Sequence, residues 1–270
     1  MTGQTLVARV APPLRIGSRR ARYLLERNLL VYRRLWLVIL SGFFEPVFYL
    51  FAIGVGIGEL VGSFVGPDGT VIEYADFVAP ALLAASAMNG AIFESTMNIF
   101  FKLRYDKVYD AILATPLSPG DIAIGEIGWS LIRGGLYAAA FLIVMAVMGL
   151  ILSPWGVLAL PSALLIGFAF AACGMAATTY MRSWQDLDMV TLVTLPLFLF
   201  SATFYPLSVY PEWLQVVARL SPLYHGVELV RACTFGVFDA SVLVHVGYLL
   251  TMGLIGLTIT NRRMAHLLLK

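Results

Sequence analysis

Charged residues are scarce in this chain. Asp, Glu, Lys and Arg make up only 13% of its 270 residues, whereas 60% are hydrophobic and the mean hydropathy is +0.85. Soluble domains carry about 25% charged residues, so this composition excludes an ordinary soluble enzyme or binding module. Several apolar runs exceed the length of about 18 residues that marks a membrane span. The chain is therefore predicted to be an all-α polytopic membrane protein, because backbone groups in lipid must be satisfied internally.

The residue types that carry most enzyme and metal chemistry are also few. Cys173 and Cys233 are expected at different depths, which argues against a disulfide between them. The three histidines are dispersed along the sequence, and neither HExxH nor CxxC occurs. No glycine is followed by lysine, so the phosphate-binding loop GxxxxGK[ST] is absent. Because this loop is absent, the chain cannot hydrolyse ATP by the mechanism that uses it. We expect no metal site and no cofactor on this chain.

Six hydrophobic segments are predicted to span the membrane as helices. Their approximate bounds are residues 35–58, 77–101, 123–150, 157–180, 187–205 and 241–260. Pro196 is expected to break the fifth span. Residues 1–34 then form an N-terminal segment, and residues 35–270 form a single six-span domain.

The distribution of cations predicts the orientation. With six spans, one side carries the cations before the first span, those at 102–107, and Arg182, Arg262, Arg263 and Lys270. The opposite side carries only Arg219 and Arg231. Because loops rich in Lys and Arg stay on the cytoplasmic side, both termini are predicted to be cytoplasmic. The chain is expected to reside in the inner (plasma) membrane.

An amphipathic helix is predicted before the first span, over residues 18–36. One arc of this helix is rich in arginine and includes Arg19, Arg22, Arg27 and Arg33. The opposite arc is apolar and consists of Ala21, Leu24, Leu25, Tyr32, Leu35 and Trp36. A basic helix of this kind lies in the interface plane of a membrane with anionic lipid.

A second amphipathic helix is predicted between the second and third spans, in the segment KLRYDKVYDAILATPLSPGD at 102–121. Its apolar face consists of Tyr105, Val108, Tyr109, Ile112 and Leu113, which follow helical spacing. The other face carries Asp106, Lys107 and Asp110. The helix should end where Thr115 precedes Pro116. We expect the apolar face to be buried in contacts and the acidic and basic groups to remain available for polar pairing.

The segment 205–240 is too apolar for a solvated loop and too short to span. It is predicted to form two short helices in the outer leaflet, one beginning near Pro211 and one running from Leu223 to Cys233. Tyr210 and Trp213 are expected at the lipid headgroups. A plain interfacial loop is the alternative.

Several polar or aromatic residues within the spans are candidates for a translocation path or gate. They are Glu45, Phe48, Asn89, Glu94, Asn98, His225 and Glu228. An ionisable group inside a membrane is a functional candidate by default. The structural alternatives are that Glu45 caps backbone freed by Pro46, and that Phe48 only packs.

Two further polar groupings have a structural interpretation. His225, Glu228 and Arg231 recur every three residues and are read as a hydrogen-bonded strip, with an outer gate as the alternative. Glu126 and Arg133 are seven residues apart near the end of the third span, and both are expected to snorkel to the interface.

Three segments carry a resemblance to a known family. They are SGFFEPVFYLFAIGVGIG, DAILATPLSPGD and FYPLSVYPEWLQVVARLSPLYHGVELVR. With the arginine-rich N-terminal helix, they make the chain resemble the permease subunit of type-2 ABC exporters. The likeness is to the branch that includes the nodulation-factor exporter permease and daunorubicin-type drug permeases, and it covers nearly the whole chain.

The resemblance implies a half-transporter that pairs with a second permease, identical or related, and with two copies of a separate ATPase that binds ATP and Mg²⁺. It makes the 18–36 helix the connecting helix, which touches the ATPase. It makes the 102–121 segment the coupling helix, seated in the ATPase. The coupling residues are then Tyr105, Asp106, Lys107, Val108, Tyr109, Asp110, Ile112 and Leu113.

The function expected from this resemblance is ATP-driven export of an amphiphile, such as a drug, a lipid or a lipid-linked oligosaccharide. Membrane lipid is the only other expected partner, and no nucleic acid is expected. An ATP-independent secondary transporter or channel is the alternative, but it predicts inverted repeats that are not found. A membrane-embedded enzyme needs clustered titratable groups, against which the dispersed histidines argue.

Overall fold

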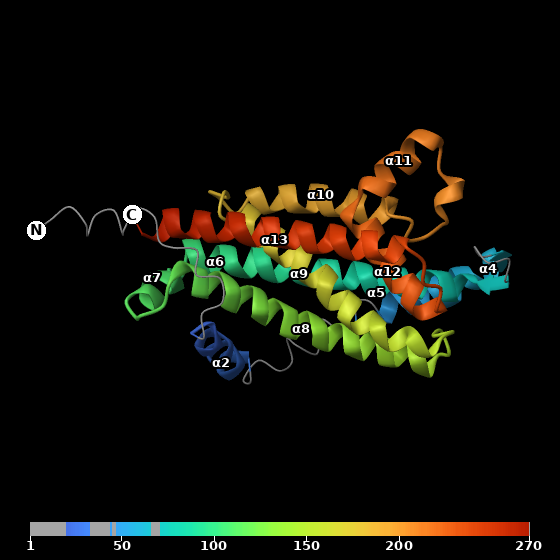
Figure 1. Cartoon of the computed structure of the whole chain (residues 1–270), viewed down its shortest axis with the longest axis horizontal. Coiled ribbons are helices and arrows are strands. Elements are labelled where there is room, and N and C mark those ends of the chain that lie inside the picture. Colours follow the sequence, from blue (N-terminus) through green and yellow to red (C-terminus); the bar gives the residue numbers. More distant parts are fainter. Residues whose placement is uncertain (1–19, 33–43, 45–46, 66–70, 270) are drawn as a thin grey trace, which may run out of the picture.

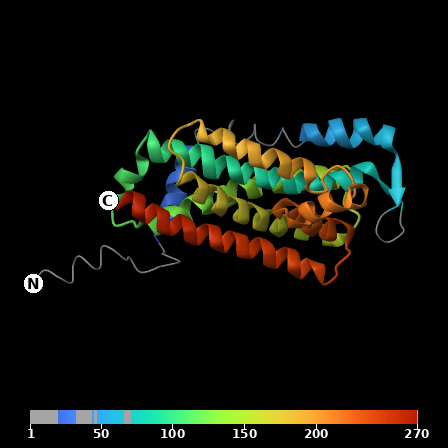
Figure 2. The ribbon, with the colours of Figure 1, turned by 90° about the horizontal axis from the view of Figure 1, so that it is seen from above.

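The computed structural model of the chain describes residues 20–32, 44, 47–65 and 71–269. In this part of the chain, four helical segments are long and apolar enough to cross a membrane: Tyr74–Arg104, Pro119–Val147, Pro154–Thr178 and Ser241–Leu268. They lie side by side along the long axis of the molecule (Figures 1 and 2). The chain is an all-α polytopic membrane protein apart from one small hairpin.

The long segments are built from several elements. The first consists of α5 (Tyr74–Phe93), the π-helix η2 (Glu94–Asn98) and α6 (Ile99–Arg104), which follow one another without a break. The second is α8 (Pro119–Val147), the third is the 3₁₀ turn η3 (Pro154–Leu158) with α9 (Ala159–Thr178), and the last is α13 (Ser241–Leu268). A further helix, α10 (Asp186–Phe200), runs beside them, and none of its residues is buried.

Helix α9 is the centre of the bundle, because it packs against α5, α8 and α13. Its sequence is rich in Ala and Gly, which lets neighbouring backbones approach closely. The backbones of α9 and α13 come close at Gly256, where an added Cβ would lie 2.7 Å from the backbone nitrogen of Cys173. Thr260 of α13 also donates a hydrogen bond of 3.2 Å to the carbonyl of Ala172.

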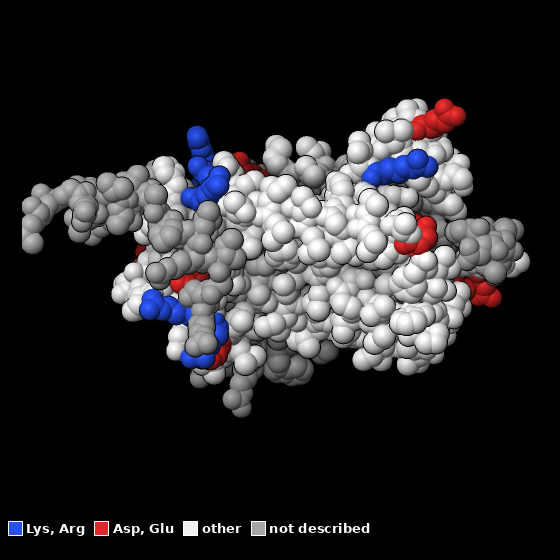
Figure 3. All heavy atoms as spheres, in the orientation of Figure 1, with Lys and Arg blue, Asp and Glu red and all other residues white. Residues whose placement is uncertain are grey.

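Shorter elements gather at the two ends of the bundle. At one end lie α2 (Ala21–Tyr32), α7 (Val108–Leu113) and the last turns of α13 (Figure 1). At the other end lie η1 (Leu50–Ile57), α4 (Gly58–Val61), η4 (Leu207–Val209), α11 (Glu212–Leu220) and α12 (Pro222–Phe235). On the face shown in Figure 3, charged side chains lie at these two ends and an uncharged belt separates them.

The structure changes several expected boundaries. Pro196 does not break the fifth segment, because α10 continues through it to Phe200. The helix expected at 241–260 extends to Leu268. Two strands, β1 (Ser63–Val65) and β2 (Val71–Glu73), pair antiparallel with Phe64 opposite Ile72, where only a loop was expected. Residues 35–43, 45 and 46 of the expected first span lie outside the described residues, so the count of six spans stays a prediction.

Candidate functional site

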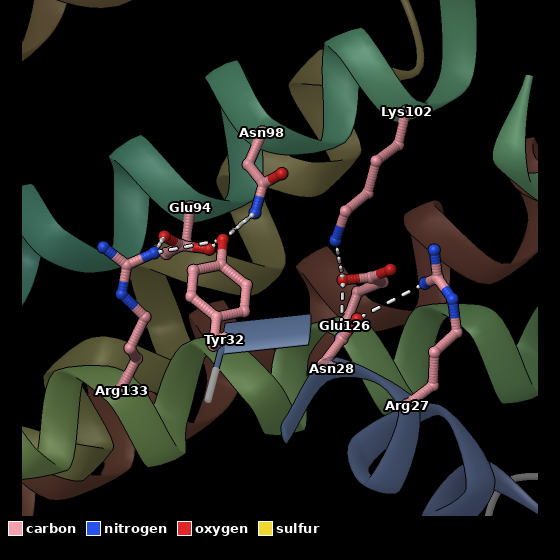
Figure 4. Close-up of polar contacts among 8 residues, drawn as sticks. All are labelled: Arg27, Asn28, Tyr32, Glu94, Asn98, Lys102, Glu126 and Arg133. Carbon is pink, nitrogen blue, oxygen red and sulfur yellow. Dashed lines mark hydrogen bonds and ion pairs between the residues drawn. The ribbon is translucent and has the colours of Figure 1, made fainter. Parts of the chain in front are cut away.

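A buried polar network joins three helical elements near the end of the bundle that carries α7 (Figure 4). It forms two layers. The lysine layer consists of Asn28, Lys102 and Glu126. The arginine layer consists of Tyr32, Glu94, Asn98, Arg133 and Tyr137. Each element supplies both layers because residues four or seven apart share one face of a helix.

Glu126 of α8 is the centre of the lysine layer. Its Oε2 lies 2.8 Å from Nζ of Lys102 on α6 and accepts a hydrogen bond of 3.4 Å from Nδ2 of Asn28 on α2. The Glu126 side chain is 2% exposed and that of Lys102 is 12% exposed. The pair is therefore removed from water, and the loss of one partner would leave a buried charge.

Arg133 of α8 is the centre of the arginine layer. Its Nη1 forms an ion pair with Oε1 of Glu94 and donates to the hydroxyl of Tyr32 at 3.3 Å. Its Nε donates to the hydroxyl of Tyr137 at 3.0 Å. Nδ2 of Asn98 donates to Glu94 at 2.8 Å and to Tyr32 at 3.2 Å. Both members of the ion pair are buried, and the guanidinium has partners on three elements.

The π-helix η2 places Glu94 and Asn98 in this layer. Thr96 and Ser95 donate their hydroxyl hydrogen bonds to the carbonyl of Ile92, at 2.7 and 3.3 Å, and such side-chain bonds compete with helix hydrogen bonds. The carbonyl of Ser95 accepts a bond of 2.9 Å from Thr178 of α9. Single wide turns of this kind occur frequently at functional sites.

Helix α2 packs closely on α8. Leu24 and Ala21 are buried there, and an added Cβ at Gly125 of α8 would lie 2.8 Å from Leu24. Arg22 is exposed, and Arg27 donates to Oδ1 of Asn28 at 3.3 Å. Arg19 and Arg33 lie outside the described residues. Leu29 and Leu30 are exposed, so the apolar side of α2 is not confined to the predicted arc.

The 102–121 segment, which was predicted to contact the ATPase as one amphipathic helix, is not a single helix. Helix α6 ends before Tyr105, which is exposed, and α7 begins after Lys107, whose φ is 49°. Tyr105 therefore does not share a face with Tyr109. Tyr109 and Ile112 are buried within this chain, Val108 and Leu113 are half-buried, and the exposed groups are Asp106, Lys107 and Asp110.

Tyr109 connects α7 to the lysine layer through space. Its side chain is 1% exposed, and neither its hydroxyl nor Oε1 of Glu126 has a partner at hydrogen-bond geometry among the described residues. Burial, followed by the negative charge of Glu126 and the interaction of the hydroxyl with that carboxylate, raises the pKa of Tyr109 well above its usual value. The charge of Glu126 thus acts electrostatically on Tyr109 of α7.

The other candidates for a path do not come together in one place. Glu94 and Asn98 belong to the arginine layer, Asn89 is exposed on α5, and Phe48 is exposed and stacked on Phe44 with ring centroids 5.9 Å apart. Glu45 lies outside the described residues.

At the opposite end, Arg231 of α12 is 5% exposed and anchors three elements. It forms an ion pair of 3.0 Å with Glu228 and donates to the carbonyls of Ala202 at 2.7 Å and Phe77 at 3.3 Å. His225 does not continue this strip, because it turns to His245 of α13 instead. The histidines are dispersed along the sequence, but the fold brings His225 and His245 together.

Sequence reasoning missed the partners of the network. Glu126 and Arg133 were expected to snorkel, but each is buried and paired with a residue of the preceding segment. The available signal was spacing, because Glu94 and Lys102 lie about two helical turns apart on one segment and Glu126 and Arg133 lie about two turns apart on the next, with complementary charges.

Comparison with known proteins assigns the chain to a family. A model of the ABC-2 type transporter family matches residues 19–235. The chain belongs to the ABC-2 type transporter family. It is 32% identical to Nodulation protein J of Rhizobium leguminosarum bv. viciae over 247 residues, which cover 88% of this chain and 93% of that protein. This family member is thus an integral membrane permease.

Two further relatives are similar to the chain over more than four fifths of its length. Nodulation protein J of Rhizobium leguminosarum bv. trifolii is 34% identical over 228 residues, covering 83% of this chain and 84% of that protein. The Inner membrane transport permease YadH of Escherichia coli K12 is 24% identical over 224 residues, covering 81% of this chain and 84% of that protein.

Proposed function

We propose that this ABC-2 permease is the transmembrane subunit of an ATP-driven exporter. Family membership carries the proposal, and the absence of a phosphate-binding loop in the sequence implies that a separate ATPase supplies ATP and Mg²⁺ chemistry. The cargo class is an amphiphile, such as a lipid, a drug or a lipid-linked oligosaccharide. Both termini are cytoplasmic in this proposal, and the membrane domain has six spans.

The exposed turn at residues 105–107 and the outer side of α7 are the proposed ATPase contact. Tyr105, Asp106, Lys107 and Asp110 are exposed there, and α2 lies at the same end of the bundle. Since Tyr109 and Ile112 are buried on the permease itself, they hold α7 in place instead of entering the ATPase. A displacement of α7 by the ATPase is then transmitted to Glu126 through Tyr109.

The network supports transmission of such a push into the spans. The lysine layer joins α6 to α8 and α2, and the arginine layer repeats these links deeper in the bundle. Two charged layers between the same helices make them move together, because separating either pair exposes a charge in a medium of low polarity.

A second permease, a homodimer partner or a related chain, is proposed to cover α10. Its fifteen residues include no buried one, and its exposed side chains are apolar apart from Asp188 and Thr191. The apolar surface suits a neighbouring membrane helix or lipid, and both occur in an assembled transporter.

The ATPase contact can be tested by charge reversal. The permease is co-expressed with a candidate ABC ATPase from the same organism, and the amount of ATPase recovered with the purified permease is measured. Asp106→Arg with Asp110→Arg should reduce this recovery strongly, whereas the control Glu212→Arg, exposed at the opposite end, should not. Equal recovery in all three proteins would show that the docking surface lies elsewhere.

The same samples distinguish the alternative function. In sealed proteoliposomes, an ABC permease with its ATPase moves an amphiphilic probe such as a fluorescent lipid only when ATP is hydrolysed. Transport by the permease alone, driven by an ion gradient, would favour a secondary transporter.

A further inference from the structure

Two histidines from different helices face each other at the end of the bundle opposite α7. His225 lies on α12 and His245 on α13, and their Nδ1 atoms are 2.7 Å apart. The two residues are 8% and 7% exposed. Neither belongs to the polar network described above, which lies at the other end of the molecule (Figures 1 and 4).

The spacing requires the two rings to share one proton. Two N–H groups would repel at this distance, and two bare nitrogens would leave buried acceptors unsatisfied. In the neutral pair, one ring therefore donates its Nδ1–H to the bare Nδ1 of the other ring, and each ring carries one proton.

A bridging metal ion fits this geometry less well than a proton. Zinc binds imidazole nitrogen at about 2.0–2.1 Å in tetrahedral sites, which places two ligand nitrogens about 3.3 Å apart. The observed 2.7 Å is the length of a hydrogen bond. Within the described residues, no group of three or more His, Cys, Asp or Glu side chains is arranged to hold a metal.

The pair sits in a contact that clamps α13 to the turn between α11 and α12. The Tyr248 ring stacks on His225 with centroids 4.1 Å apart, and the Tyr248 hydroxyl donates to the carbonyl of Leu220 at 2.8 Å. Ser221 in the same turn shares a hydrogen bond of 2.6 Å with Ser201 after α10. A change at the histidine pair is thus placed to loosen α11 and α12 from the last membrane helix.

We propose that His225 and His245 form a proton-binding site that holds α12 to α13 while at least one ring is neutral and releases it when both rings are imidazolium. The first added proton leaves one ring neutral, so the hydrogen bond between the two Nδ1 atoms is kept and becomes charge-assisted. A second added proton removes the acceptor and sets two N–H groups and two positive charges against each other. Separated rings bind both protons near the ordinary histidine value of about 6.5. The second proton therefore favours separation, and the stability of the contact falls as the pH is lowered well below about 6.5.

The acidic neighbours of the pair are already engaged elsewhere. On α12, the charge of Glu228 acts on His245, but Glu228 is paired with Arg231, and Tyr224 lies edge-on to both rings. Arg219 of α11 is itself positive. Asp239, which precedes α13, acts on His245 from a distance, and it accepts from the backbone N–H of Ser241 at 3.0 Å.

Helices packed behind the pair add no charge beside it. Helix α9 contains no charged residue, and the charged residues of α8 lie in the half of that helix nearest α7. The acidic residues of α10, Asp186 and Asp188, begin that helix at the far end of the bundle. Asp76 of α5 interacts with Glu73.

The chain provides a matched control, because its third histidine, His266, is exposed at the other end of α13. The full-length permease is labelled with ¹⁵N-histidine and placed in nanodiscs, where both faces meet the same buffer, so the result depends neither on orientation nor on an ATPase. At about pH 7.5 the wild type and His266→Gln should both show one Nδ1–H···Nδ1 hydrogen bond by nitrogen–nitrogen coupling. His245→Gln should lose it.

Thermal unfolding supplies the second measurement. The unfolding midpoint of the wild type and of His266→Gln should fall between about pH 7.5 and about pH 5. This acid-induced fall should be smaller in both His225→Gln and His245→Gln. An equal fall in all four proteins, or no coupled nitrogens in the folded wild type, would overturn the proposal. So would Zn²⁺ raising the midpoint in a manner that needs both histidines, because it would identify a metal site instead.

Discussion

Replacing Arg133 by methionine removes the centre of the arginine layer and keeps most of the side-chain volume. Glu94 is then left buried, with Asn98 as its remaining polar partner at 2.8 Å. Removing one member of a buried ion pair costs about 3–5 kcal/mol, because the other charge stays uncompensated. At about 1.4 kcal/mol per factor of ten, the unfolding constant should rise between roughly a hundredfold and a few thousandfold.

The double variant Glu94→Gln with Arg133→Met separates the ion pair from loss of packing. Replacing both members of a buried pair by uncharged groups is often neutral or even stabilising, so the double variant should recover most of the stability lost in Arg133→Met. The neutral hydrogen bond to Tyr137 provides a scale: Tyr137→Phe should cost only about 0.6 kcal/mol, the average for such bonds in a membrane protein.

The assay is reversible unfolding of the purified permease in mixed micelles, with the exposed Arg22→Met as the control for loss of an arginine. Arg22→Met should leave the unfolding constant unchanged. If Arg133→Met behaves like Arg22→Met, the guanidinium is not buried beside Glu94. If the effects of the two single changes simply add in the double variant, the two residues do not interact.

Three other predictions follow from single contacts. Gly256→Ala should lower the unfolding midpoint, because the new Cβ meets the α9 backbone at 2.7 Å, whereas Gly247→Ala on the same helix meets nothing within 4 Å and should not lower it. Tyr109→Phe should remove a loss of folding stability above about pH 10, since the folded state raises this pKa; an unchanged alkaline limb in pH-dependent unfolding would contradict this. Ser118→Ala should cost about 1 kcal/mol in the same unfolding assay, because Ser118 caps α8.

The membrane helices could largely be predicted from the sequence, because long apolar runs have one stable solution in lipid. The ends of α8 illustrate how local signals add to this. Ser118 accepts from the backbone of Asp121 at 3.2 Å, Asp121 accepts from the backbone of Ser118 at 2.9 Å, and Pro119 occupies the first turn. These residues form a capping box that can be read from the letters SPGD.

The break between α6 and α7 could not be read in this way. Helical spacing continues through Tyr105 and Tyr109, but Lys107 adopts a left-handed conformation and the chain turns there. Pro196 illustrates the opposite error, because α10 continues through a residue that usually disrupts a helix. Membrane helices tolerate proline where neighbouring groups satisfy the freed backbone carbonyl, and such neighbours are not visible in a local pattern.

Pairing between helices was the main feature beyond the reach of one sequence. Arg133 reaches Glu94, and His225 reaches His245, only because of the depth and rotation at which the helices pack. A charge near the end of a span can snorkel or pair, and the choice depends on what faces it. The sequence pattern identified Glu94 and Asn98 as candidates but not the residues that hold them.

The two kinds of bond in the network predict how firmly each helix is held. Helix α2 is joined to the layers through Asn28 and Tyr32, which are neutral, and through the packing of Leu24 on Gly125. Its detachment would leave Lys102–Glu126 and Glu94–Arg133 intact, at a polar cost on the scale of about 0.6 kcal/mol per bond. Separating α5–η2–α6 from α8 would break both ion pairs, each on the scale of about 3–5 kcal/mol. The network therefore makes α6 and α8 a rigid pair and leaves α2 the element that can change position at the lowest cost.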